Sequence, residues 1–243
     1  MFIRIILNSF KADIKFIARD PMLLLASIAP LFLILLLRLV FPVLSEFILQ
    51  KFEVQIYQYY SIAAITMVSL IPMLFGMVYA FILLDESDAH VLQVISVTPA
   101  GRNNFLYMRM IVPAFLSFLM VLLTIIFTNP MPSEGWLRTL FVSLLLASQV
   151  PYVFLFIGSL ARNKVEGLAL SKFYGVFLVT VPLGLLLHHP WNYLNFFSPL
   201  YWISWAWVSQ NPLESLMYGG IAVFLTSGCV VWLFRHFLKK QVH

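Results

Sequence analysis

Six apolar runs dominate this sequence, and each is long enough to cross a lipid bilayer as a helix. An α-helix rises about 1.5 Å per residue, so roughly 20 apolar residues span a hydrocarbon core about 30 Å thick. The runs cover residues 22–42, 59–84, 105–128, 136–161, 167–187 and 213–237. Because they occupy most of the 243 residues, little chain is left for a folded aqueous domain. We therefore expect one all-α membrane domain over residues 1–243.

The composition excludes several other classes of protein. Hydrophobic residues make up 62% of the chain and charged residues 10%, and the mean hydropathy is +0.94, which is outside the soluble range. The single cysteine, Cys229, rules out an intrachain disulfide and a thiolate metal cluster. His188 and His189 are adjacent and do not face the same way, and HExxH is absent, so no metal site is expected. The net charge of +5 comes from scattered cations, so no nucleic-acid partner is expected.

Residues 1–20 show the periodicity of an amphipathic helix. Its apolar stripe contains Ile3, Ile6, Leu7, Phe10, Ile14 and Ile17, and the other face carries Arg4, Asn8, Lys11, Lys15 and Arg19. This pattern predicts an interfacial helix that lies flat on the membrane. Charges recur at every turn and include Asp13 and Asp20, unlike those of a cleaved signal peptide. Asp20 followed by Pro21 fits an N-cap and a first-turn proline, so the first span is expected to begin there.

The distribution of basic residues predicts the topology. All but three of the 15 Lys and Arg residues lie beside one set of alternating span ends; the exceptions are Arg38, Lys51 and Arg138. The positive-inside rule then places both termini and the segment 85–104 in the cytoplasm. We expect a multi-pass protein of the plasma membrane, the inner membrane in a bacterium. On the outer side, residues 43–58 are expected to form a short interfacial helix, and residues 129–135 a proline-rich turn.

Segment 85–104 is unusually polar for a connection between two apolar runs. It opens with three acids, Asp85, Glu86 and Asp88, and continues with an apolar helical face before the Thr98-Pro99 break. The simplest interpretation is that the acids end the second span at the water boundary and cap a helix. A short surface helix with an apolar face is also suited to docking into a groove on another protein.

Segment 188–212 differs from the other connections because it has four tryptophans and no Lys, Arg, Asp or Glu. Its prolines, Pro190, Pro199 and Pro212, interrupt any long helix. Since tryptophan favours the headgroup layer, we expect this segment to enter the outer leaflet as one or two short helices. It would form a re-entrant segment between the fifth and sixth spans.

In this order, the features resemble ABC type 2 (ABC-2) exporter permeases, the membrane subunits of ATP-binding-cassette transporters. The resemblance rests on the acidic segment with Thr98-Pro99 and Gly101-Arg102, and on Ser198-Pro199-Leu200-Tyr201-Trp202 before the last span. It implies that segment 85–104 is a coupling segment for a separate cytoplasmic ATPase, and that the permease pairs with a second copy or a paralogue. The resemblance assigns ATPase docking to Asp85, Glu86, Asp88, His90, Val91, Leu92, Ile95, Thr98, Pro99 and Arg102.

The energy source is expected to lie outside the chain. The sequence has no GxxxxGK[ST] motif, so ATP and Mg²⁺ are expected in the partner, and no cofactor in this chain. An ion-coupled carrier normally needs intramembrane carboxylates, and no Asp or Glu falls in the central part of any span. An intramembrane enzyme would need convergent acids or histidines, which the spans also lack. These two classes remain the alternatives to a permease.

Four residues are candidates for the substrate path, namely Arg38, Ser69, Gln149 and Trp202. Each also has a structural interpretation. Arg38 can reach the lipid headgroups or pair with Glu46 or Glu53, and Gln149 can satisfy backbone groups freed by Pro151. Ser69 fits a helix contact and Trp202 an interfacial anchor. The expected substrate is hydrophobic or amphipathic, such as a drug, a lipid-linked molecule or a peptide, and it would move outward.

Overall fold

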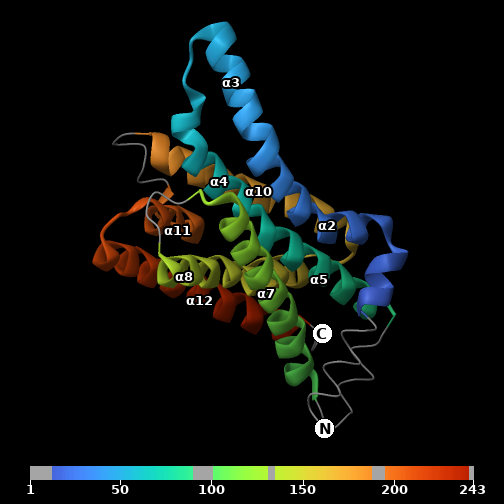
Figure 1. Cartoon of the computed structure of the whole chain (residues 1–243). Coiled ribbons are helices and arrows are strands. Elements are labelled where there is room, and N and C mark those ends of the chain that lie inside the picture. The colour runs from blue at the N-terminus through green and yellow to red at the C-terminus, as the bar shows by residue number, and fades with distance from the viewer. Residues whose placement is uncertain (1–12, 90–100, 131–134, 188–194, 241–243) are drawn as a thin grey trace.

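The fold is an all-helical bundle (Figure 1). The structure, a computed structural model, describes residues 13–89, 101–130, 135–187 and 195–240. Within these ranges there are helices and no strand, and six helical segments are long and apolar enough to cross a membrane. The predicted six-span fold is therefore confirmed. The segments are Pro21–Phe52, Ile56–Asp88, Phe105–Thr128, Trp136–Leu160, Lys164–Leu186 and Pro212–Lys239.

Several spans are built from more than one helix. The first contains α2 (Pro21–Leu35), η1 (Leu36–Val40) and α3 (Phe41–Phe52), and the second contains η2 (Ile56–Tyr59), α4 (Tyr60–Val68) and α5 (Leu70–Asp88). The third is α7 (Gly101–Thr128), and the fourth contains α8 (Trp136–Ala147) and α9 (Gln149–Leu160). The last elements are α10 (Lys164–Leu186), α11 (Pro199–Val208) and α12 (Pro212–Lys240).

The first span begins where the sequence predicts. Residues 13–19 are helical, and Asp20 then accepts a hydrogen bond from the backbone N–H of Met22 at 3.0 Å. This is the side-chain cap that an N-terminal helix end requires. Pro21 occupies the first turn, where its missing N–H is not needed.

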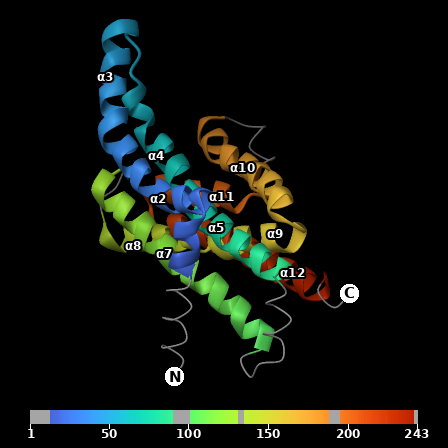
Figure 2. The ribbon, with the colours of Figure 1, turned by 90° about the vertical axis from the view of Figure 1, so that its right-hand side faces the viewer.

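The first span does not end where expected. Residues 43–58 were expected to form a separate interfacial helix, but α3 continues the first span to Phe52, where Glu53 adopts a left-handed conformation (φ 56°). The proline ring of Pro42 conflicts with an ordinary α-turn, because it lacks an N–H and crowds the carbonyl of Arg38. A π-helical turn, η1, relieves this clash. In it the N–H of Phe41 bonds to the carbonyl of Leu36, five residues earlier. Residues 41–59, which we call the arm, therefore project beyond the other helices (Figures 1 and 2).

Two inner spans are bent by the same local sequence pattern, a serine three residues before a proline. The break between α4 and α5 lies at Ser69, before Pro72, and that between α8 and α9 lies at Ser148, before Pro151. A proline removes one backbone donor and frees a carbonyl, which bends the helix. The kink that Pro151 predicts in the fourth span is confirmed.

The second and fourth spans form the centre of the bundle. In their most apolar windows 72% and 67% of the residues are buried, against 22–33% in the other four spans. The outer spans thus expose apolar side chains, which lipid can cover in a membrane. At the centre, α5 and α9 approach closely at Gly76, where an added Cβ would lie 2.7 Å from the Cβ of Val153.

Gly76→Ala is expected to destabilise the protein by about 1–3 kcal/mol, because the helices must move apart to admit one methyl group. The measurement is the thermal unfolding midpoint of the detergent-purified protein. Gly220→Ala on α12 is the matched control, since a Cβ there has no heavy atom within 4 Å. Equal midpoints for the two variants would contradict this account of the α5–α9 contact.

Candidate functional site

The bundle has two ends of different character. At one end, α5, α9 and α12 finish together, and Leu84, Ala161 and Phe237 line a shared cavity of about 240 Å³. This end also contains the two ion-pair clusters described below, and we call it the charged end. The other end contains the arm (Figure 2) and the C-terminal end of α11, where Trp207 bonds to Ser61 of α4, and we call it the arm end.

The first cluster joins three elements through Arg109. Its guanidinium on α7 donates from Nη1 to Asp13 and from Nη2 to Glu86, at the end of α5. The side chains of Arg109 and Asp13 are only 9% and 6% exposed, and that of Glu86 is 18% exposed. Burial raises the pKa of Asp13, while the positive charge of Arg109 opposes that rise. Buried charges persist only when they are paired, so each member of this cluster depends on the others.

The second cluster repeats this arrangement closer to solvent. Lys164, the first residue of α10, places Nζ 3.0 Å from Asp20 and 2.7 Å from Asp85. All three side chains are about one-quarter to one-third exposed. The hydrogen bond from Lys164 holds the pKa of Asp20 below its usual value. Because Asp85 and Glu86 are consecutive, the last turn of α5 is tied to α7 and to α10.

The predicted docking residues fall into three groups in the structure. Asp85, Glu86 and Asp88 lie in the last turn of α5, where the first two bond within the chain and Asp88 is exposed. Arg102 belongs to α7, although its side chain is not described. The other six, His90, Val91, Leu92, Ile95, Thr98 and Pro99, lie outside the described residues. Docking of an ATPase at these positions stays a prediction.

The partners of these acids were not predicted. In the sequence, Arg109 and Lys164 are only two of the basic residues that indicate the topology, and Asp13 only argues against a signal peptide. One signal was present, because an arginine inside a membrane-crossing helix is expected to have an acidic partner. The described residues contain no group of three or more His, Cys, Asp or Glu that can hold a metal ion. The clusters connect the end of α5 to α7 and α10 by ion pairs.

The four candidate path residues do not converge on one site. Gln149 is buried between α9 and α12, where its Nε2 donates to Oγ1 of Thr226 at 2.8 Å. Ser69 is also buried and donates to the carbonyl of Ile65 at 2.7 Å. Trp202 donates from Nε1 to the carbonyl of Phe196 at 2.9 Å. Arg38 alone of the four lines a described pocket, at the arm end. Participation of any of them in a transport path stays a prediction.

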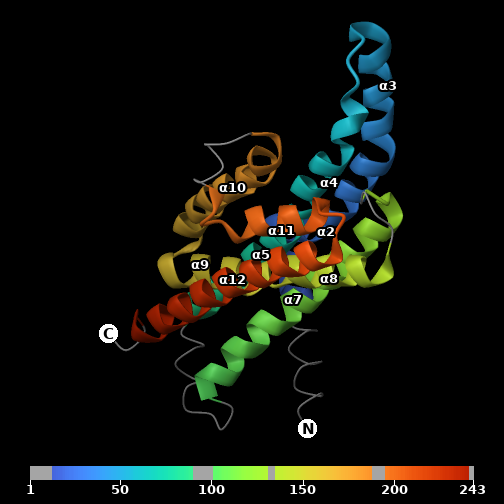
Figure 3. The same cartoon turned by 90° about the vertical axis from the view of Figure 1, so that its left-hand side faces the viewer.

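Segment 188–212 was expected to contain one or two short helices, and α11, with ten residues, is one such helix; residues 188–194 lie outside the described residues. It packs against α10 and α12 (Figure 3). At its C-terminal end, Arg138 from α8 donates to the carbonyl of Trp207 at 2.6 Å and to that of Ser209. The indole N–H of Trp207 donates to Ser61 at 2.9 Å, which ties α11 to α4. A cation at a helix C-terminus satisfies carbonyls that lack partners within the helix.

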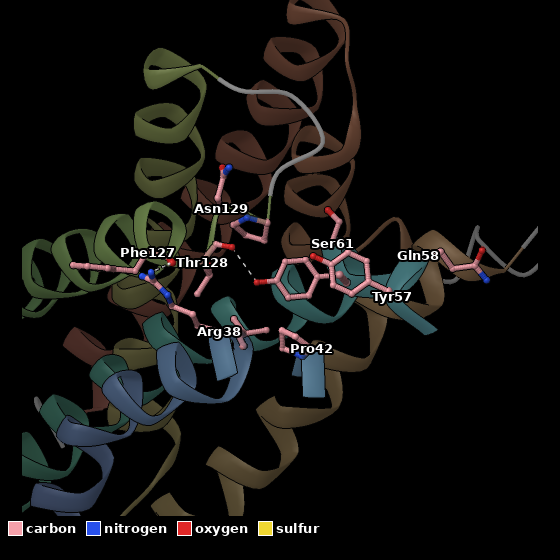
Figure 4. Close-up of a pocket in the computed structure, with 11 residues that line it drawn as sticks. Arg38, Pro42, Tyr57, Gln58, Ser61, Phe127, Thr128 and Asn129 are labelled. Carbon is pink, nitrogen blue, oxygen red and sulfur yellow. Dashed lines mark hydrogen bonds between the residues drawn. The ribbon is translucent and has the colours of Figure 1, made fainter. Parts of the chain in front are cut away.

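A pocket of about 590 Å³ separates the arm from the end of α7 (Figure 4). We call it the arm pocket, and its lining includes Arg38, Pro42, Tyr57, Tyr60, Ser61 and Asn129. Arg38 donates from Nη1 to the carbonyl of Phe127 at 3.1 Å, and the Tyr60 hydroxyl donates to the carbonyl of Thr128 at 3.0 Å. These bonds join η1 and α4, the elements on either side of the arm in the sequence, to the C-terminal turn of α7. The pocket therefore combines a cation with an aromatic wall.

An all-helical bundle of six spans, with a short helix buried between the last two, defines the chain as a multi-pass membrane protein. The chain belongs to the family described as Fluoroquinolones export permease protein Rv2686c-like, whose profile matches residues 13–235. This membership is consistent with the ABC-2 type permease that the sequence resembles and confirms the expected family.

Two curated relatives come from two strains of Mycobacterium tuberculosis. They are named Fluoroquinolones export permease protein MT2760 and Fluoroquinolones export permease protein Rv2686c. Each is 28% identical to this chain over 244 aligned residues, which cover 94% of this chain and 92% of the relative. No solved structure matches the chain.

Proposed function

We propose that this chain is the membrane subunit of an ABC exporter that moves amphipathic aromatic molecules outward, driven by a separate cytoplasmic ATPase. The observation that carries the proposal is the match to an export-permease family over residues 13–235. The names of the relatives favour a drug of the fluoroquinolone type over the lipid-linked molecule or peptide considered above. The ATPase would hold ATP and Mg²⁺, since this sequence has no phosphate-binding GxxxxGK[ST] motif.

In the proposed topology the charged end faces the cytoplasm of a bacterial cell, as the excess of Lys and Arg on that side favours. Two permease subunits, identical or paralogous, enclose one path, and two ATPases dock at their coupling segments. Closure of the ATPases on ATP pushes on residues 90–100, which directly follow α5. Asp85 and Glu86 pass that displacement to Lys164 and Arg109, so α10 and α7 move with α5. The cluster residues are thus positioning residues for transport.

The test is to disrupt the apolar face of the coupling segment. Leu92→Asp with Ile95→Asp is expected to reduce co-purification with the ATPase and substrate-stimulated ATP hydrolysis at least about tenfold, because a docked apolar helix face loses its burial. Membrane insertion, measured by fractionation, is expected to stay normal. Gln93→Asp is the matched control, since it adds a charge to the polar face of the same segment.

Unchanged export by the Leu92→Asp, Ile95→Asp variant would refute docking at this segment. Export by the purified permease without any ATPase would refute the ABC mechanism and favour an ion-coupled carrier. A fluoroquinolone accumulation assay in cells that express the permease with its ATPase measures the first outcome, and drug transport by proteoliposomes that contain the permease alone measures the second.

A further inference from the structure

Arg38 is held at the arm pocket by an unusual piece of backbone. It lies in the middle of the π-helical turn η1, which forms because Pro42 follows four residues later. Single π turns inside α-helices occur frequently at functional sites. This turn places the guanidinium beside the end of α7, with Tyr57 and Asn129 around the same opening (Figure 4).

The positive charge of Arg38 is not neutralised by the described residues. None of the pocket's lining residues is acidic, and neither Glu46 nor Glu53, the acids of the arm, lies within ion-pair distance of Arg38 in the described structure. A guanidinium has five N–H donors, and the bond to the carbonyl of Phe127 uses one of them. Arg38 can therefore offer a paired set of donors to a carboxylate or a phosphate.

Arg138, the other arginine at the arm end, shows the contrast. It also borders a pocket, of about 540 Å³, but its Nη2 already donates to backbone carbonyls at the end of α11. Its role is accounted for by the fold. Arg38 makes one backbone bond and faces an open pocket.

The wall beside Arg38 suits a flat ring. Tyr57 and Tyr60 are stacked, with ring centroids 5.5 Å apart and an interplanar angle of 1°. The bond from the Tyr60 hydroxyl to the carbonyl of Thr128 fixes one ring, while Tyr57 remains 58% exposed. The volume of about 590 Å³ lies within the range of small-molecule sites.

We infer that the arm pocket binds the anionic group of an amphipathic aromatic molecule, with Arg38 on the anion and Tyr57 against the ring. The inference deepens the proposed function, because in the proposed topology the pocket opens on the outer side and would receive the exported molecule there. A lipid phosphate carries the same anionic chemistry, so the experiment tests the drug carboxylate and the lipid phosphate separately.

The experiment measures binding of a fluoroquinolone and of its ethyl ester to the purified permease in nanodiscs, without an ATPase. The acid is expected to bind about tenfold more tightly than the ester, since a hydrogen bond to a charged group supplies about that factor. Arg38→Gln is expected to abolish this preference, and Arg38→Lys to keep part of it. Lys51→Gln, on the adjacent arm but outside the pocket lining, is the matched control. Unfolding midpoints check that each variant is folded.

Two lipid compositions separate the two sources of the anion. The drug acid is first bound in phosphatidylcholine nanodiscs, and phosphatidylglycerol is then added. If this addition weakens binding only in protein that retains Arg38, the lipid phosphate and the drug carboxylate share the site. If phosphatidylglycerol has no effect, the site selects the aromatic acid. An equal affinity for acid and ester, or a preference that survives Arg38→Gln, would overturn the inference. Because no ATPase is present, this outcome is distinct from a failure of ATP-driven export.

Discussion

Replacing Arg109 by methionine is expected to lower the free energy of unfolding by about 3–5 kcal/mol at neutral pH, the usual result of breaking a buried ion pair from one side. The substitution leaves the carboxylates of Asp13 and Glu86 together, with the exposed fraction of Asp13 only 6%. A methionine of similar length fills the space but supplies no positive charge. Thermal and denaturant unfolding of the purified permease in detergent measure the loss.

The loss is expected to be larger at pH 8 than at pH 5. Burial already raises the pKa of Asp13, and Arg109 is the group that lowers it. Without Arg109 that pKa rises further above its unfolded value. A carboxyl group whose folded pKa is raised favours the folded state below its unfolded pKa, and this advantage disappears as the pH rises through the folded pKa. Arg109→Met should therefore recover part of its stability on acidification.

Three comparison variants separate charge from packing. Lys164→Met breaks the more exposed cluster, so its cost is expected to be at most about 1 kcal/mol. Arg109→Lys keeps the charge but offers one donor nitrogen in place of Nη1 and Nη2, so its loss of stability is expected to be intermediate. The neutral triple variant Asp13→Asn, Glu86→Gln, Arg109→Met is expected to regain most of the stability, because replacing a whole buried ion cluster is often nearly neutral. Equal losses in the triple and single variants would contradict the electrostatic explanation.

The triple variant also tests the proposed coupling role. If Glu86 acts through Arg109 and not by contact with the ATPase, and the first cluster transmits movement from α5 to α7, the variant is expected to fold and to bind its ATPase but to export poorly. The readouts are the amount of co-purified ATPase and the ratio of drug transported to ATP hydrolysed. Full export with restored stability would show that the cluster only holds the helices together.

The sequence predicted those features that depend on nearby residues. Span lengths follow from apolar composition, the start of α2 from Asp20-Pro21, and the bend in the fourth span from Pro151. The arm was not predicted because Pro42 permits either a helix end or a π turn. The structure has the π turn, and the bonds from Arg38 and Tyr60 to the end of α7 form with it. The Asp13–Arg109 pair joins residues 96 positions apart, and a single sequence indicates that an arginine within a span needs an acidic partner but not which acid supplies it.

Arg138→Met is expected to loosen α11, the helix buried between the fifth and sixth spans at the arm end. The side chain of Arg138 donates to the carbonyls of Trp207 and Ser209, which are 0% and 9% exposed as residues. A buried carbonyl left without a donor costs about 1–3 kcal/mol, so the last turn of α11 should open more often. We expect faster hydrogen exchange in residues 199–208 and reduced export, measured by mass spectrometry and drug accumulation.

The position of Arg138 makes this result distinguishable from a general loss of folding. Arg138 lies at the arm end, whereas the predicted ATPase contacts follow α5 at the charged end, so co-purification with the ATPase should be unchanged. Arg138→Lys can replace one donor and is expected to restore part of the protection, while Lys51→Met tests loss of a cation elsewhere at the arm end. Because the N-terminal end of α11 is held by the bond from Thr180 to Ser198 at 2.9 Å, its first turns should remain protected. Exchange that rises equally throughout α5 and α9 would mean that Arg138 stabilises the whole bundle, and unchanged exchange in α11 would mean that its carbonyls do not need this cap.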